Sequence, residues 1–154
     1  MKGREPKESN DIFFVCSLIE HIARRTNNHR SVIVNAIGRT KLQHIYDLAD
    51  IYHSENIDKL SDELINDCKI ESGNFDNVQA AKYSIPSLWD IGKVYKRLIL
   101  SVIDYRNTPD SIGIIMEVFN SWIVRRIEDF NSSLFYENPD YIFQSYLIGD
   151  VLDE

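Results

Sequence analysis

The sequence has few cysteines and no long hydrophobic run. Its two cysteines, Cys16 and Cys68, lie far apart and lack the spacing of a metal site or a disulfide framework. No apolar run approaches the length needed to span a membrane, and the N-terminus lacks the basic start, apolar stretch and cleavage site of a signal peptide. We therefore expect two reduced thiols in a cytoplasmic protein that does not enter the membrane.

Glycine and proline are also scarce, with six and four residues in a chain of 154. The chain contains no Walker loop, no GxGxxG and no HExxH motif, and we expect neither a cofactor nor a metal. Strand-like alternation of useful length is missing as well. The apolar periodicity instead predicts an all-α, compact bundle of about seven helices.

The chain length is typical of a single domain. Residues 1–8 are expected to form a loose arm. Helices are expected at about 9–25, 31–37, 40–53, 57–67, 88–105, 109–130 and 139–148, with a helical turn near 78–81. The loop at 71–86 could separate sub-units 9–70 and 84–149. Neither half alone is expected to form a large hydrophobic core, so we expect one domain that folds cooperatively.

The stretch 31–53 predicts two short helices hinged at Gly38. Ser31 is expected to cap the first, and Gly38 to end it, because glycine accepts the left-handed conformation found at many helix ends. Thr40 and Gln43 have the spacing of a capping box for the second. A helix, a turn and a helix are also the gross pattern of a DNA-binding unit. In that alternative the recognition helix would begin with Thr40, Lys41, Gln43 and His44.

Charge is unevenly distributed along this acidic chain, whose net charge is −7. The window from His21 to Tyr46 has no Asp or Glu, and its cations are Arg24, Arg25, Arg30, Arg39 and Lys41. From Asp47 to Asp76 nine acids face two lysines, and the last 27 residues hold seven acids and no Lys or Arg. Such a dipole steers a charged partner to one face. The alternatives are charges that cancel within the fold or in a homo-oligomer, and phosphate contact by the arginines.

Two further groups of residues suggest sites. Phe135, Tyr136 and Tyr141 surround a turn and could form an exposed patch of aromatic anchors, a residue type that dominates interfaces. Two His/Asp pairs at helical spacing, His44 with Asp47 and Asp50 with His53, could belong to a small enzyme of unknown class. The two pairs point to different sides of a helix, so one metal site using all four is not expected.

One resemblance rests on the segments Ile12–Glu20, Ser31–Ile37, Ile45-Tyr46 and Tyr52–Ile57. Their apolar spacing and polar positions, over residues 11 to about 67, resemble a family of short uncharacterised bacterial proteins encoded beside presumed toxins of the ADP-ribosyltransferase type. That resemblance implies an antitoxin-like or accessory role. It carries over no catalytic residue, and it does not cover residues 71–154.

The leading interpretation is a non-enzymatic protein-interaction module that covers a protein partner with a preformed helical surface. A helix-turn-helix DNA-binding regulator is the second interpretation, and a small enzyme is the third.

Overall fold

Helices are the regular elements of this chain over residues 6–152, which are the residues that the computed structural model describes. They are α1 (Pro6–Thr26), α2 (Arg30–Asp47), α3 (Ala49–His53), α4 (Ile57–Asp67), α5 (Asn77–Ala80), α6 (Leu88–Arg106), α7 (Ser111–Phe119), α8 (Trp122–Ile127), the 3₁₀ turn η1 (Leu134–Tyr136) and α9 (Pro139–Ile148). The all-α prediction is confirmed. Of the expected arm, residues 1–5 lie outside the described residues, and α1 already begins at Pro6.

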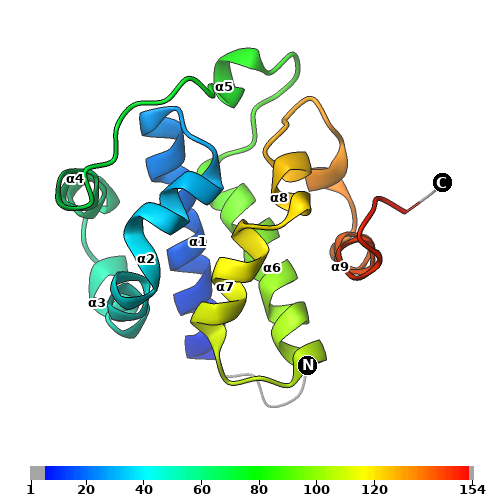
Figure 1. The fold of residues 1–154 in the computed structure, drawn as a ribbon, viewed down its shortest axis with the longest axis horizontal. Coiled ribbons are helices and arrows are strands. Elements are labelled where there is room, and N and C mark those ends of the chain that lie inside the picture. The colour runs from blue at the N-terminus through cyan, green and yellow to red at the C-terminus, as the bar shows by residue number, and fades with distance from the viewer. Residues whose placement is uncertain (1–5, 153–154) are drawn as a thin grey trace.

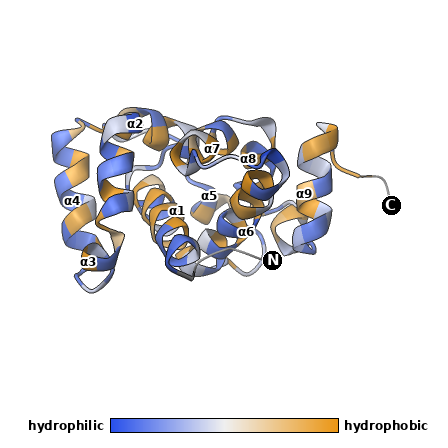
Figure 2. Cartoon of the chain, turned by 90° about the horizontal axis from the view of Figure 1, so that it is seen from below, coloured by the Kyte–Doolittle hydropathy of each residue, from blue (hydrophilic) through white to orange (hydrophobic). Residues whose placement is uncertain are grey.

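The helices form two packed layers with a helix at each end. α1 and α6 lie side by side in one layer, and α2, α7 and α8 form the other (Figures 1 and 2). α4 covers one end of the molecule and α9 the other (Figure 2). The expected sub-units 9–70 and 84–149 therefore meet along the full α1–α6 contact and share one continuous hydrophobic core.

The centre of that core is α1. Every residue from Phe14 to Ala23 is buried except His21, because α2, α4 and α6 all pack against this helix. A helix that is apolar on nearly all sides is stable in water only when neighbours surround it. The approach of α6 is closest at Gly92, where an added Cβ would lie 2.1 Å from Ser17 Oγ and 3.2 Å from Ser17 Cα.

Several helix starts agree with the sequence expectations. Asn56, Ser87 and Asn138 each accept a backbone N–H bond at the start of α4, α6 and α9. The bounds of α4 match the expected 57–67. α9 ends at Gly149, whose φ of 91° lies in the left-handed region. These local signals act within a few residues of the chain, which is why the sequence reveals them.

The hinge region differs in detail from the expectation. Gly38 does break α2, with φ 82° and ψ 164°. Ser31 is not a cap, because α2 begins one residue earlier, at Arg30. The side-chain amide of Gln43 donates to Asp47 Oδ1 at 2.9 Å, as a pairing within the helix. The expected helix 40–53 is also divided at Leu48, which separates α2 from α3.

The expected helix at 109–130 is two helices, α7 and α8. Asp110 caps the start of α7 and accepts the Gly113 N–H. Asn120 ends α7 because its side chain donates to the Met116 carbonyl and pairs with Asn35 of α2. Such breaks raise the helix count above the expected seven. None of the helices between residues 6 and 152 has the length and apolar character needed to span a lipid bilayer.

Candidate functional site

Four of the five cations singled out in the sequence form ion pairs within the fold, and three of the four are partly exposed. Arg24 contacts Glu20 at 2.7 Å, Arg25 contacts Asp62 at 2.6 Å, and Arg39 contacts Asp110 at 2.5 Å. The positive window and the acidic segments thus meet inside one molecule, largely through α1–α4 and α2–α7 contacts. Lys41 is exposed and has no ion pair with any described residue.

Arg30 is the clearest correction to the predicted interaction surface, because it is fully buried and faces no partner. Its Nε and Nη2 donate to the two carboxylate oxygens of Glu20, at 2.7 and 2.6 Å. Burial works against the charge of Glu20, but Arg30 and Arg24 outweigh it and hold the pKa of Glu20 below its ordinary value. A charge this deep in the protein is tolerated only when paired and hydrogen-bonded.

A second buried carboxylate takes the capping role expected of Ser31. Glu128, at the end of α8, accepts the backbone N–H of Arg30 at 3.0 Å, which is one of the unpaired donors at the start of α2. Its other oxygen lies 2.5 Å from His29 Nδ1. The His29 ring stacks on Phe75, with centroids 3.8 Å apart. These contacts join the α2 start to the 71–86 loop and to α8.

The residues proposed for DNA contact share the second part of α2. Thr40, Lys41, Gln43 and His44 are all exposed. Acidic side chains accompany them, because Gln43 is hydrogen-bonded to Asp47 and neighbouring Arg39 is paired with Asp110. A DNA phosphate that approached this face would meet the carboxylates of Asp47 and Asp110, which already accept from Gln43 and Arg39.

The His/Asp pairs are not brought together into one centre. Asp50 and His53 line an open depression of about 490 Å³ with Asn10 and Asp11 of α1, while His44 lies on α2. The ring of His53 lies 5.6 Å from that of Phe14. Within residues 6–152, no three His, Cys, Asp or Glu side chains converge as metal ligands would.

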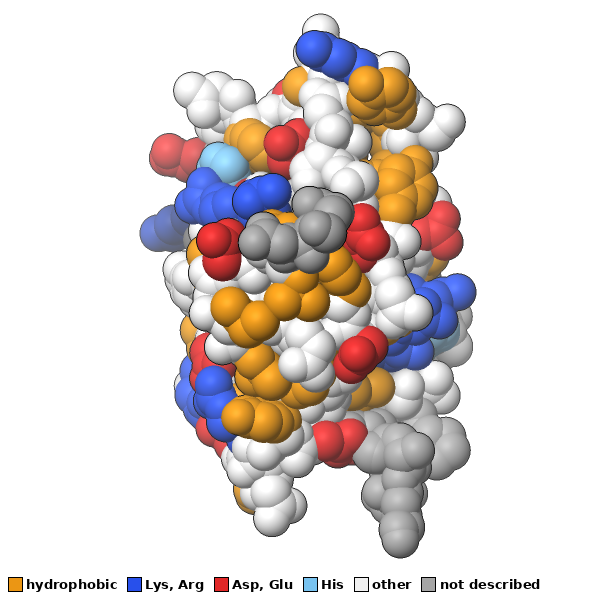
Figure 3. Space-filling view, turned by 90° about the vertical axis from the view of Figure 1, so that its right-hand side faces the viewer, with side chains coloured by type: hydrophobic (Ala, Val, Ile, Leu, Met, Phe, Trp, Pro, Cys, Tyr) orange, Lys and Arg blue, Asp and Glu red, His pale blue; other side chains and the backbone are white. Residues whose placement is uncertain are grey.

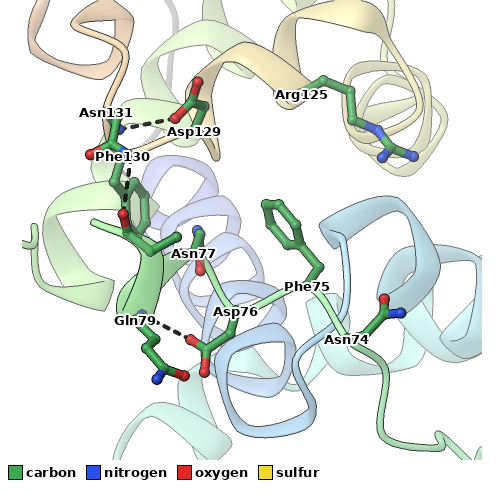
Figure 4. A pocket seen from close by; sticks show the side chains of 10 residues that line it. Asn74, Phe75, Asp76, Asn77, Gln79, Arg125, Asp129, Phe130 and Asn131 are labelled. Atoms are coloured by element: carbon green, nitrogen blue, oxygen red, sulfur yellow. Dashed lines mark hydrogen bonds between the residues drawn. The ribbon is translucent and has the colours of Figure 1, made fainter. Parts of the chain in front are cut away.

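An open pocket of about 550 Å³, lined by polar side chains together with Phe75 and Phe130, lies between the 74–80 segment and the end of α8 (Figure 4). Phe75 points into it, with Arg125 on one side and Asn77 on the other (Figure 4). Many of its polar groups bind one another: Asp76 accepts the Gln79 N–H, and Asn131 donates to the Ala80 carbonyl. These bonds hold the loop in place, so we assign these polar groups a structural role in joining the loop to α8.

The aromatic anchors are divided between core and surface. Phe135 is buried and packs edge-to-face on Phe130, so its prediction as an exposed anchor is wrong. Tyr141 is half-buried, and its hydroxyl donates to the Leu152 carbonyl at 2.7 Å. Tyr136 is 67% exposed and rests on Phe135, with ring centroids 4.2 Å apart. Of the three, Tyr136 is the one presented to solvent on a rigid support.

Two adjoining hollows flank Tyr136 and together form what we call the Tyr136 groove. Their volumes are about 220 and 360 Å³, and both are lined by Val94, Phe135 and Tyr136. Ile85 and Pro86 close one end, and Pro139 and Ile142 the other. The face that carries α9 shows hydrophobic side chains gathered in a band between charged ones (Figure 3).

Sequence reasoning missed most of this groove. Val94 fits the inward stripe of α6, and Ile85 looks like part of a connecting loop. The groove exists because the 84–86 segment, α6, η1 and α9 come together from distant parts of the chain. Phe135 and Tyr136, aromatic residues in a polar turn, are the groove residues that the sequence singled out.

Comparisons with protein families, with curated proteins and with solved structures found no match to this chain.

Proposed function

We propose that this protein is a non-enzymatic, cytoplasmic binding module that holds a protein partner in the Tyr136 groove. The observation that carries the proposal is the groove itself: exposed Tyr136 and Ile85 flank an apolar floor of Val94 and Phe135. In protein interfaces, binding energy concentrates on aromatic anchors that become buried in the complex, next to a preformed pocket.

The rigidity of the groove supports the same conclusion. η1 is held by Phe135, whose ring contacts both Phe130 and Tyr136. α9 is fixed by the Asn138 cap, and its Tyr146 hydroxyl donates to Glu117 of α7 at 2.5 Å. A surface that is already ordered loses less conformational entropy when a partner binds.

In an antitoxin-like or accessory role, the module would act by covering its partner. The groove lies in residues 84–142, outside the segment on which the resemblance to toxin-adjacent proteins rests. The partner therefore need not be the one that those proteins bind.

Affinity capture of the tagged chain from its host tests the proposal with two tyrosine variants. Tyr136→Ala removes the anchor, and Tyr83→Ala is the matched control because Tyr83 is 69% exposed and lies outside the groove. We expect a protein that binds wild type and Tyr83→Ala, and binds Tyr136→Ala about 30-fold more weakly, as for an interface hot spot. Equal capture by both variants would contradict the groove as the binding site.

A DNA-binding regulator is the second candidate, because Thr40, Lys41, Gln43 and His44 are all exposed on one short segment. The same capture, analysed for nuclease-sensitive material, tests it. Nucleic acid that is retained at low salt and released at high salt would favour this candidate over the protein-binding module.

A further inference from the structure

Three of the described cations that have no ion pair lie together, outside the basic window that the sequence singled out. Lys93, Lys96 and Arg97 lie within one turn of α6, at positions i, i+3 and i+4. None of the three forms an ion pair with any residue of the described chain. Among the described residues, the other cations without an ion pair are Lys41, Lys59, Lys69, Lys82 and Arg126, and they lie on separate segments.

This α6 basic cluster is held together against its own repulsion. Burial, and then the neighbouring charges of Arg97 and Lys93, lower the pKa of Lys96. Like charges at three- and four-residue spacing destabilise a helix. Asp90, three residues before Lys93, is exposed and makes no ion pair with it. An acidic partner would relieve this repulsion, whereas Arg24, Arg25 and Arg39 are already neutralised inside the fold.

Aromatic rings border the cluster. Trp89, one turn before Lys93, is 41% exposed, and its ring lies 5.8 Å from that of Phe13. The Lys96 ammonium lies 5.8 Å from the centre of the Phe13 ring. On its other side the cluster reaches the Tyr136 groove, because Arg97 and Val94 both line the hollow beside Tyr136. Cluster and groove are one continuous surface, joined at Arg97.

We propose that the partner presents an acidic polypeptide segment to this surface. Its carboxylates pair with Lys93, Lys96 and Arg97, and its apolar side chains enter the Tyr136 groove. This inference rests on the proposed function, since the groove supplies the apolar half of the contact. It adds the chemical class of the partner and three residues that recognise it.

A polypeptide fits better than a nucleic acid or an anionic membrane. The chain carries a net charge of −7, and Asp90 and Glu137 line the same hollows as Arg97 and Tyr136. A continuous row of phosphates would meet these carboxylates, whereas the carboxylates of a peptide are separated by neutral residues. Three cations also make only a short track, and nucleic-acid affinity grows with the number of phosphates neutralised.

Panning a random peptide display library on the full-length wild-type protein tests the proposal without knowledge of the natural partner. We expect the bound peptides to be enriched in Asp and Glu next to aromatic or aliphatic residues. The strongest synthetic peptide is then measured by fluorescence anisotropy against Lys93→Glu/Arg97→Glu, against Tyr136→Ala, and against the control Lys59→Glu/Lys69→Glu, which makes the same charge change elsewhere.

We expect Lys93→Glu/Arg97→Glu to bind the peptide about tenfold or more weakly than wild type does. We also expect the affinity of wild type to decrease when the NaCl concentration is raised from about 0.05 to about 0.5 M. The control should bind as wild type does. Thermal unfolding separates binding from folding: the α6 double variant should melt close to wild type, because Lys93 and Arg97 are exposed and make no ion pair within the described chain.

Other outcomes distinguish failure of this inference from failure of the proposed function. Neutral peptides that depend on Tyr136 but bind the α6 double variant as tightly as wild type would overturn the acidic partner and keep the groove. No enriched peptide would overturn both. Tight binding of a single-stranded oligonucleotide or of anionic lipid vesicles through Lys93 and Arg97, without acidic peptides, would overturn the choice of partner class.

Discussion

At the scale of single residues, the ion pair of Arg30 with Glu20 joins α1 to the start of α2, next to the end of α8. Arg30 lies at the start of α2, Glu20 in the middle of α1, and Glu128 at the end of α8, and all three are buried. Besides Glu20, Arg30 contacts the Asn28 carbonyl through Nη1 at 3.2 Å. The pair therefore fixes the path of the 26–30 turn as well as neutralising two charges.

Removing one member of this pair should cost far more than removing both. Arg30→Met leaves Glu20 buried with only Arg24, and we expect it to lower the free energy of unfolding by about 3–5 kcal/mol. Glu20→Leu should behave similarly. The double variant Glu20→Leu/Arg30→Met should recover much of the loss, because the carboxylate of Glu20 and the guanidinium of Arg30 are removed together. Urea denaturation measures all four proteins, and a double variant that costs the sum of the singles would disprove the coupling.

At the scale of elements, the contact between α1 and α6 depends on small residues. Gly92 faces Ser17, whose buried hydroxyl has no hydrogen-bond partner in the described structure. Tyr95, one turn along α6, also buries an unpartnered hydroxyl. The close packing of α1 and α6 is thus accompanied by two buried hydroxyl groups without a hydrogen bond in the described structure, which is unfavourable for stability.

Substitutions at this crossing should therefore have opposite effects. Gly92→Ala would place a methyl group 2.1 Å from Ser17 Oγ, and we expect it to lower the free energy of unfolding by about 1–3 kcal/mol through overpacking. Ser17→Ala should be neutral or raise it by about 1 kcal/mol, because an unpaired buried hydroxyl is removed. Thermal and urea unfolding measure both. A stable Gly92→Ala variant would show that α1 and α6 can move apart freely.

At the scale of the whole molecule, charge patterning along the sequence is converted into internal contacts. The basic window on α1 and α2 meets Asp58 and Asp62 of α4 and Asp110 before α7. Most of these pairs are partly exposed, and such pairs each contribute little stability. Their main effect is on the electrostatic field at the surface, because they neutralise most of the basic window, whereas Lys93, Lys96 and Arg97 on α6 have no ion pair within the described chain.

The shared core also predicts that neither half folds alone. A fragment of residues 1–84 keeps α1 but loses α6, which covers α1 along its length. We expect that fragment to show little helix by far-ultraviolet circular dichroism, and to regain helix when mixed with residues 85–154. Cooperative unfolding of the first fragment by itself would show that residues 9–70 form an independent unit.

The sequence by itself determined the helical class, the positions of the isolated caps and the break at Gly38. These depend on apolar periodicity and on side chains within a few residues of each other, as at Asn56, Ser87 and Asn138. It also revealed the unequal charge distribution and pointed to Tyr136 as an exposed aromatic anchor.

Only the tertiary structure decided what those features do. Arg30 could not be recognised as buried, because its partners Glu20 and Glu128 lie 10 and 98 residues away along the chain. Phe135 and Tyr136 are neighbours in η1, yet one enters the core and the other faces solvent, because successive side chains of a 3₁₀ turn point to different sides. Packing between distant segments determines which cations form ion pairs. Lys93, Lys96 and Arg97 form none within the described chain, and they lie beside the Tyr136 groove.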